Sequence, residues 1–313
     1  VTFTSGGTEA NVLALRSAVA AGSRRILISS IEHDCVRETA FSSGVEVEEL
    51  PVDDRGVIDL AAVDAALSAH PEDAGPVFVA VMAANNETGV IQPTQAVADR
   101  VRAAGGWLHV DAVQLAGRRR SDLASLGADS LALSAHKIGG PQGVGALVAG
   151  PRTRIVRDMP GVGSNRSGTQ NLIGAAGFGA AAEAVLSATP DPALLRARDE
   201  AAQSLAAAGA VIVGEGADRL DDVLCIAAPG FGSELQVMGL DLAGVRVSAG
   251  AACSSGKVRP SRVLGAMGLH DLAGCAIRLS GGWSSRPEDW RRAASAWTEL
   301  YARQASRPRP AAA

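Results

Sequence analysis

The sequence predicts an α/β protein with two domains. A large domain over residues 1–188 is expected to hold a mostly parallel, doubly wound sheet, and residues 189–305 a smaller α+β domain. First, short apolar segments alternate with alanine-rich helical patterns through the large domain. Second, those apolar segments are unbroken, which is typical of parallel strands buried on both faces. Third, the composition changes at Ala188-Thr-Pro-Asp-Pro192, which indicates a linker.

Each element is placed by its own pattern. In the large domain, strands are expected at 25–30, 45–50, 76–83, 107–111, 130–134 and 144–149, and helices at 8–21, 34–43, 59–69, 94–104 and 170–188. Asp59 and Thr94 are candidate N-caps for two of these helices. In the smaller domain, strands are expected at 210–213, 222–227, 244–248 and 275–280. Because Val1–Thr4 reads as the end of a strand, we expect that an N-terminal segment is missing from this sequence.

Composition narrows the class of protein. The 313 residues are 47% hydrophobic, enough to bury a sizeable core, and the net charge of −4 gives no reason to expect nucleic acid or an anionic membrane as a partner. The four cysteines are scattered without zinc-like spacing, and no apolar run is long enough to span a membrane. We therefore expect a cytoplasmic protein, with a solvated turn at Arg118–Arg120 and a disordered tail over residues 306–313.

A glycine-containing turn near the start is the first candidate site. Ser5-Gly-Gly-Thr-Glu-Ala-Asn11 joins the first strand to a helix, and the free N–H groups of a first helical turn can hold a phosphate. An ordinary glycine turn with Thr8 as the helix N-cap explains the same residues. The chain has neither the lysine of a P-loop nor a GxGxxG turn after a strand, so nucleotide binding is disfavoured.

Two charged residues follow buried strands. Asp111 ends the strand 107–111, at the sheet edge where ligands bind in open α/β folds, and a carboxylate there could keep the ring nitrogen of pyridoxal phosphate protonated. Lys137 follows the strand 130–134 among small and apolar neighbours; desolvation would favour the free amine that attacks an aldehyde. The alternatives are an aspartate that caps a helix and a lysine that snorkels to solvent.

Cys253 and Arg278 are candidates in the smaller domain. Cys253 lies among small residues, Ser248–Gly256, which favours an accessible, reactive thiol, whereas Cys225 has the bulky neighbours of a structural cysteine. Arg278 interrupts an apolar strand, and an arginine in such a position usually has a fixed anionic partner. That anion could be a substrate carboxylate or an internal salt-bridge partner.

Taken together, these residues resemble the cysteine desulfurases of the NifS/IscS type, which are class V aminotransferases of the pyridoxal-phosphate-dependent fold type I. The resemblance runs from Thr2 to about Trp290. The motifs that carry it are Phe3-Thr-Ser-Gly-Gly-Thr-Glu9, Glu32-His33, Asn85-Asn-Glu-Thr-Gly-Val90, His109-Val-Asp-Ala-Val-Gln114, Ser134-Ala-His-Lys137, Arg166-Ser-Gly-Thr169 and Gly250-Ala-Ala-Cys-Ser254. Three segments depart from the family pattern: a shorter stretch between Lys137 and Thr169, a slightly short stretch from Thr8 to His33, and the expected missing N-terminal segment.

The resemblance implies a role for each matching residue. Lys137 would bind pyridoxal phosphate covalently, and Cys253 would take sulfur from the substrate as a persulfide. The remaining residues would contact cofactor or substrate: Gly7, Thr8, Ser134 and His136 the phosphate, Thr169 the phosphate of a partner subunit, Asp111 the ring nitrogen, Gln114 the phenolic oxygen, His33 the ring face, and Asn86 and Arg278 the substrate carboxylate, with Asn86 also beside the cofactor. No metal is expected, since the run Glu32-His-Asp-Cys35 cannot converge on one ion.

The implied activity is conversion of L-cysteine to alanine, with sulfur delivered to an acceptor protein for iron–sulfur clusters or thiolated cofactors by a homodimer. The alternatives are another class V enzyme, namely a selenocysteine or cysteine-sulfinate lyase or an aminotransferase, and an inactive relative that serves as a scaffold.

Overall fold

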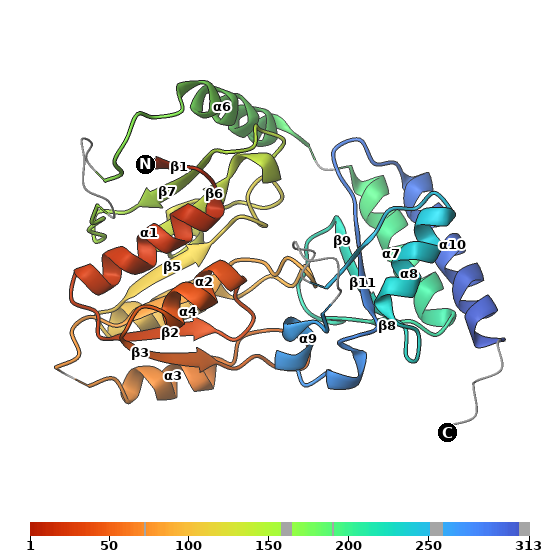
Figure 1. Ribbon diagram of the computed structural model, residues 1–313, viewed down its shortest axis with the longest axis horizontal. Helices are drawn as coiled ribbons and strands as arrows, with labels where there is room; N and C mark the ends of the chain where they lie inside the picture. The colour runs from red at the N-terminus through yellow and green to blue at the C-terminus, as the bar shows by residue number, and fades with distance from the viewer. Residues whose placement is uncertain (72, 158–164, 190, 251–258, 307–313) are drawn as a thin grey trace. The chain divides into compact units, whose positions relative to one another are not determined.

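The computed structural model describes residues 1–71, 73–157, 165–189, 191–250 and 259–306. The chain forms two compact units (Figure 1). The large unit comprises residues 1–53, 57–86 and 91–189, and the small unit comprises 54–56, 87–90 and 190–313. Two short pieces from the N-terminal half thus group with the C-terminal unit, which a single linear boundary does not capture.

The large unit is built on a mixed sheet of seven strands in the order β1-β7-β6-β5-β4-β2-β3. The strands are β1 (Thr2–Thr4), β2 (Arg25–Ser29), β3 (Glu46–Leu50), β4 (Phe78–Met82), β5 (Trp107–Asp111), β6 (Ser130–Ser134) and β7 (Gly145–Ala149). The strands from β6 to β3 are parallel, and β7 runs antiparallel to both β6 and β1. The predicted mostly parallel sheet is confirmed.

Helices cover the sheet in two groups. The helix α1 (Gly7–Ala20) packs on β5, β6 and β7 and on α2 (Asp34–Phe41), while α3 (Leu60–Ser68), α4 (Thr94–Ala103) and α5 (Leu123–Leu126) contact one another in series. A sixth helix, α6 (Leu172–Ser187), follows β7 in the chain. Alternate strand residues such as Ile26 and Ile28 are fully buried beneath α1 and α2. One set of alternate side chains on each central strand therefore faces α1.

Asp59 and Thr94 differ as N-caps. Asp59 caps α3, because its carboxylate accepts hydrogen bonds from the N–H groups of Ala61 and Ala62. The prediction for Thr94 is wrong: Pro93 occupies the N-cap position of α4, and Thr94 is the first helical residue and buried. The proline ring fixes φ and sets the entry of the chain into the helix without a side-chain cap.

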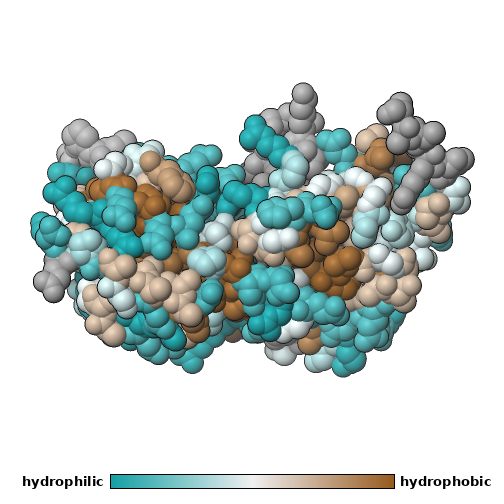
Figure 2. All heavy atoms as spheres, turned by 90° about the horizontal axis from the view of Figure 1, so that it is seen from below, coloured by the Kyte–Doolittle hydropathy of each residue, from teal (hydrophilic) through white to brown (hydrophobic). Residues whose placement is uncertain are grey.

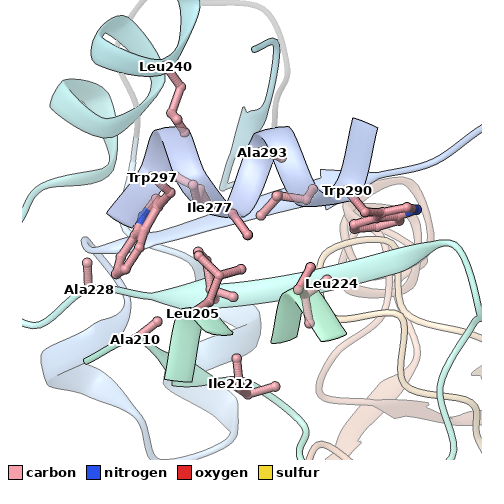
Figure 3. Close-up of a cluster of buried hydrophobic side chains, with 14 of the residues drawn as sticks. Leu205, Ala210, Ile212, Leu224, Ala228, Leu240, Ile277, Trp290, Ala293 and Trp297 are labelled. Atoms are coloured by element: carbon pink, nitrogen blue, oxygen red, sulfur yellow. The ribbon is translucent and has the colours of Figure 1, made fainter. Parts of the chain in front are cut away.

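The small unit has an antiparallel sheet in the order β10-β11-β9-β8, packed against helices. Its elements are α7 (Pro192–Ala207), β8 (Val211–Ile212), β9 (Val223–Ala227), α8 (Ser233–Leu242), β10 (Ser248–Ala249), α9 (Arg262–Ala266), β11 (Ala276–Ser280) and α10 (Pro287–Ala305). Leu205, Leu224, Ile277 and Trp297 meet in its core (Figure 3). This arrangement gives the small unit a hydrophobic core of its own.

The strand expected at 244–248 is mostly wrong, since β10 begins only at Ser248. Gly244 has a φ of 73°, and the N–H of Val245 bonds back to the carbonyl of Leu240 in α8. The segment is thus the turn that ends a helix, and its valines pack against the core from that turn.

The surface carries hydrophobic patches between hydrophilic ones on the face that Figure 2 shows. Leu172, Ile173 and Leu186 of α6 are more than 70% exposed in the single chain. Within the described ranges, no single helix has the length and hydropathy of a membrane span; α6 and α7 meet both criteria only when taken as a bent pair.

Candidate functional site

Four parallel strands place their carboxyl ends at one edge of the large unit's sheet. Because β2, β4, β5 and β6 are in parallel register, the residues that follow them lie along the same edge. Those residues are His33 after β2, Asn86 after β4, Asp111 and Gln114 at the end of β5, and Ser134, His136 and Lys137 at the end of β6. The sheet topology therefore brings together the large-unit residues predicted from separate motifs.

The turn between β1 and α1 reaches the same edge through β7. Gly145 pairs with Thr4 on one side and with Ser134 on the other. A Cβ at Gly145 would lie 2.5 Å from the carbonyl carbon of Gly6, and a Cβ at Gly7 would lie 2.6 Å from a methyl group of Val113. Both positions require glycine because the turn is pressed against its neighbours, so the N-terminus of α1 is held beside Ser134.

Thr8 is not the N-cap of α1. The helix begins at Gly7, the N-cap is Gly6, and no side chain caps it. Thr8 is exposed in the first turn, where backbone N–H groups have no partner within the helix. This geometry matches an anion site better than an ordinary capped turn.

Asp111 is a buried carboxylate at the end of β5. Its Oδ2 accepts from Asn11 Nδ2 at 2.7 Å, and its Oδ1 accepts from the N–H of Val113 at 3.0 Å. Burial raises the pKa of Asp111, although these hydrogen bonds and the charges of His33 and Lys137 oppose the rise. The next described helix, α5, begins only at Leu123, so Asp111 is not a helix cap.

Lys137 ends a single 3-10 turn, Ala135–Lys137, directly after β6. Its side chain is exposed in the isolated chain, so the expectation of a lysine desolvated by its own chain is wrong. Ser134 Oγ lies 3.0 Å from His136 Nδ1, and partial burial and the charge of Lys137 lower the pKa of His136.

His33 is the N-cap of α2. Its Nδ1 accepts a hydrogen bond from the N–H of Cys35 at 3.2 Å, so in the neutral ring the proton resides on Nε2. Burial and the charge of Asp111 raise the pKa of the Cys35 thiol to about 12. Within the described ranges no group of three or more His, Cys, Asp or Glu side chains could hold a metal ion.

Arg118 contacts Gln114, an interaction the sequence interpretation missed. Arg118 Nη1 donates to the carbonyl of Gln114 at 2.7 Å and to its Oε1 at 3.3 Å. Arg118 lies in a turn, as predicted for Arg118–Arg120, but it is half-buried, whereas Arg120 is exposed as expected. By holding Oε1, it turns the amide Nε2 of Gln114 the other way as a donor.

The remaining candidates are Thr169, Arg278 and Cys253. Thr169 is exposed ahead of α6. In the small unit, Arg278 on β11 donates to Ser248 Oγ at 3.3 Å. Cys253 is among the residues that the structure does not describe, whereas Cys225 on β9 is buried as expected, and burial raises its pKa to about 12.

Three buried residues behind Asp111 were also missed as site residues: Asn11, His109 and Ser130. A signal for one of them is present in the sequence. Strand β5 reads Trp-Leu-His-Val-Asp, so every second residue carries a hydrogen-bonding group in a strand that is otherwise apolar.

The fold and these residues define the class of protein. Residues 1–289 match the family model described as aminotransferase class V, and the chain belongs to this family. It is 40% identical to a cysteine desulfurase of Cereibacter sphaeroides over 291 residues, which cover 90% of this chain and 74% of that protein. It is 37% identical to a cysteine desulfurase of Sinorhizobium fredii, over 90% of this chain and 75% of the relative. A NifS-like protein from Rickettsia africae superposes with a TM-score of 0.87 at 28% identity, covering 96% and 81% of the two chains.

Class V aminotransferases depend on pyridoxal phosphate, and the described residues fit that group. The cofactor needs a carboxylate for its ring nitrogen, an amine for its aldehyde and donors for its phosphate. Asp111 supplies a buried carboxylate. Because burial disfavours its negative charge, a cationic ring nitrogen would compensate that charge. Lys137 supplies the amine on the same edge, and the α1 N-terminus with Ser134 supplies donors beside Gly7, where no larger side chain fits.

Proposed function

We propose that this chain is a pyridoxal-phosphate-dependent L-cysteine desulfurase that removes sulfur from L-cysteine and leaves alanine. The observation that carries the proposal is the convergence of Asp111, Lys137 and the α1 N-terminus at one sheet edge, in a chain whose relatives are named cysteine desulfurases. When bound, pyridoxal phosphate supplies an electron sink that weakens bonds at the α-carbon of an amino acid.

The residues at the sheet edge are proposed to bind and orient cofactor and substrate. Lys137 forms the covalent attachment. Asp111 pairs with the ring nitrogen, and Gln114, oriented by Arg118, donates from Nε2 to the phenolic oxygen. The phosphate is proposed to bind Gly7, Thr8, Ser134 and His136. Asn86, beside the cofactor, and Arg278 are proposed to bind the substrate carboxylate; a fixed guanidinium suits a bidentate carboxylate.

His33 is proposed to stack on the ring and to carry a proton. Its Nδ1 accepts from the N–H of Cys35, so Nε2 carries the proton of the neutral ring and is the atom that presents it as a donor. The exposed Lys137 amine is the second proton carrier on the same edge.

Cys253 is proposed to accept the sulfur atom as a persulfide. The neighbouring residues in the sequence are small, which would let an acceptor protein reach the thiol. Sulfur would then pass to iron–sulfur cluster or thio-cofactor assembly, and we propose that this takes place in the cytoplasm.

The proposed assembly is a homodimer. Support comes from α6, where Leu172, Ile173 and Leu186 are 75%, 89% and 87% exposed in the single chain, and from the exposed Thr169 just ahead of it. Light scattering should give the mass of two chains, and Ile173→Lys should shift the mass towards one chain. A monomeric wild-type protein would contradict the dimer.

The test of the activity is incubation of the protein with L-cysteine, pyridoxal phosphate and a thiol, with alanine and sulfide measured. Both products should form with the wild type. Lys137→Ala should abolish both products together with the visible absorbance of the bound cofactor, and Cys253→Ala should abolish sulfide. Cys275→Ala, a partly exposed cysteine with no proposed role, should match the wild type. Absence of products with the wild type, or full sulfur release by Cys253→Ala, would refute the proposal.

A further inference from the structure

A line of polar side chains runs along the face of β5 that α1 covers. Trp107, His109 and Asp111 are alternate residues of the strand, so their side chains point to the same face. Ser130 on β6 is the register partner of His109, and Asn11 lies on α1 above them. Four of the five, all except the partly exposed Trp107, are buried.

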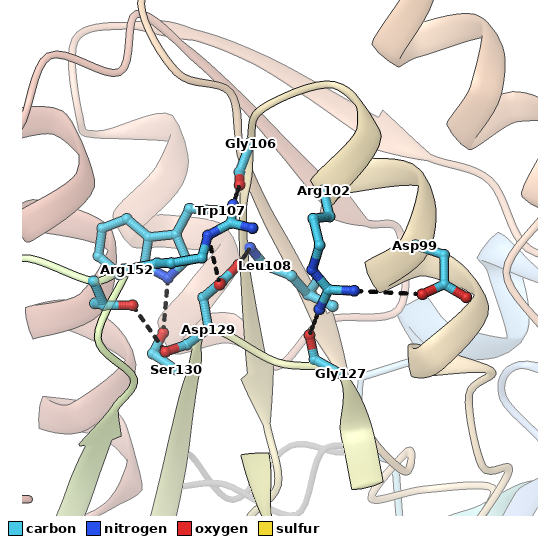
Figure 4. Close-up of polar contacts among 10 residues, drawn as sticks. Asp99, Arg102, Gly106, Trp107, Leu108, Gly127, Asp129, Ser130 and Arg152 are labelled. Atoms are coloured by element: carbon cyan, nitrogen blue, oxygen red, sulfur yellow. Dashed lines mark hydrogen bonds and ion pairs between the residues drawn. The ribbon is translucent and has the colours of Figure 1, made fainter. Parts of the chain in front are cut away.

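These side chains form an unbroken hydrogen-bonded chain. Trp107 Nε1 donates to Ser130 Oγ at 3.0 Å, and Ser130 Oγ lies 2.8 Å from His109 Nδ1. His109 Nε2 lies 2.8 Å from Asn11 Oδ1, and Asn11 Nδ2 donates to Asp111 Oδ2 at 2.7 Å. Figure 4 shows the first of these bonds beside Asp129, which accepts from the N–H of Leu108.

The chemistry of the two ends fixes the direction of the chain. An indole N–H can only donate, and an ionised carboxylate can only accept. Asn11 must therefore present its amide to Asp111 and its carbonyl to His109, which must carry its proton on Nε2. Its Nδ1 then accepts from the Ser130 hydroxyl, whose oxygen accepts from Trp107. Every donor points towards Asp111.

The reverse direction is disfavoured. It would need a protonated Asp111 and a proton on His109 Nδ1, and it would place two N–H donors on the single oxygen of Ser130. The hydroxyl proton of Ser130 would then need another acceptor in a buried position.

We propose that Asn11, His109 and Ser130 are positioning residues that hold Asp111 ionised and fix the orientation of its carboxylate towards the ring nitrogen of the cofactor. The proposal deepens the proposed function and rests on it. With one contact each from Asn11 and Val113, the carboxylate keeps lone pairs for a further donor.

The surrounding groups maintain the direction of the hydrogen bonds. Burial lowers the pKa of His109 to about 3, so the imidazole stays neutral and the direction of the bonds persists through the physiological range. The ring of Phe78 stacks on His109 at 6.1 Å and meets Trp107 edge-on at 5.2 Å, which holds both rings in place.

The first test reads the proton on His109 without the cofactor. Nitrogen-15 NMR of labelled histidine in the full-length protein distinguishes the two neutral forms of the ring. We expect His109 to carry its proton on Nε2 from about pH 5 to pH 8. A proton on Nδ1, or titration near the ordinary histidine pKa, would overturn the proposal.

The second test interrupts the hydrogen-bonded chain of side chains by substitution and measures how tightly each variant binds pyridoxal phosphate. Ser130→Ala removes the member between Trp107 and His109 without touching Asp111, and Asn11→Leu removes the contact with Asp111 itself. We expect pyridoxal phosphate to bind severalfold more weakly to Ser130→Ala and about tenfold or more weakly to Asn11→Leu. In both, the pH midpoint of the cofactor's visible band should shift, which a loss of stability alone would not cause.

Ser17→Ala is the matched control. Ser17 is a buried serine of α1 that is hydrogen-bonded to the backbone of Val156 and is not a member of the hydrogen-bonded chain that ends at Asp111. It should keep the wild-type affinity and midpoint. If Ser130→Ala and Asn11→Leu match Ser17→Ala, the positioning role is refuted while the desulfurase proposal stands. If the wild type fails to bind pyridoxal phosphate, the proposed function fails instead. The NMR result remains decisive if a variant does not fold.

Discussion

Gly145 offers the sharpest test of how the fold builds the proposed phosphate site. In Gly145→Ala the new Cβ would lie 2.5 Å from the carbonyl carbon of Gly6, 2.6 Å from the carbonyl oxygen of Leu133 and 2.7 Å from the Cα of Gly6. To reach an ordinary contact of 3.4 Å, the turn before α1 must withdraw by about 0.9 Å. These are backbone atoms, so no rotamer change relieves the clash.

The expected cost has two parts. Overpacking of a tight site destabilises a protein by about 1–3 kcal/mol. A withdrawal of about 0.9 Å would also stretch hydrogen bonds from the α1 N-terminus to the phosphate beyond their useful range, and each such charge-assisted bond contributes about 1.5–3 kcal/mol. Binding of pyridoxal phosphate should therefore weaken by about 10- to 100-fold.

Two measurements check this prediction: unfolding in urea without cofactor, and titration with pyridoxal phosphate followed by absorbance. Gly274→Ala is the control, because a Cβ there meets nothing within 4 Å and its φ is not in the left-handed region. An affinity of Gly145→Ala within twofold of the wild type would refute the assignment of the phosphate to this turn.

Three further predictions concern stability. His109 is buried, and burial lowers its pKa to about 3, so below about pH 6.5 the unfolded chain binds a proton that the folded chain does not. The free energy of unfolding should therefore fall by about 2–3 kcal/mol between pH 6.5 and 4.5. The fall should be smaller in His109→Gln. Burial alone would raise the pKa of Glu9, but hydrogen bonds from Arg166 and Ser5 hold it below its usual value. Glu9→Gln should therefore cost up to about 1 kcal/mol at pH 7, with the difference vanishing as acid protonates Glu9; a difference that persists in acid would contradict the ion pair. Ser261→Ala should cost about 2–3 kcal/mol in urea unfolding, because Ser261 caps α9 and donates to the buried Glu87 carboxylate at 2.6 Å. A loss below about 0.5 kcal/mol, the size expected of a surface substitution, would contradict this.

Local patterns predicted the strands of the large unit well. The strands 107–111 and 130–134 match to the residue, because polar residues or glycines flank short apolar runs. The strand expected at 244–248 failed because apolar residues that pack from a turn look the same in sequence as strand residues. A pattern of apolar residues reports burial, and only neighbouring backbone bonds decide the secondary structure.

The site residues likewise fall into those that a local pattern predicts and those that it cannot predict. Asp111 and Lys137 were predictable because Asp111 ends one buried strand and Lys137 comes within one short turn of another. Asn11 and His109 were not predicted as partners, since they are 98 residues apart and meet only when α1 packs on β5. The exposure of Lys137 was equally unpredictable, because it depends on a three-residue turn at the sheet edge.

The most direct test of the desulfurase proposal is mass spectrometry of the protein after exposure to L-cysteine and pyridoxal phosphate. The proposal predicts the added mass of one sulfur atom on Cys253, removed by a reducing thiol and absent in Lys137→Ala. An unmodified Cys253 in wild-type protein that has bound pyridoxal phosphate and L-cysteine would contradict it.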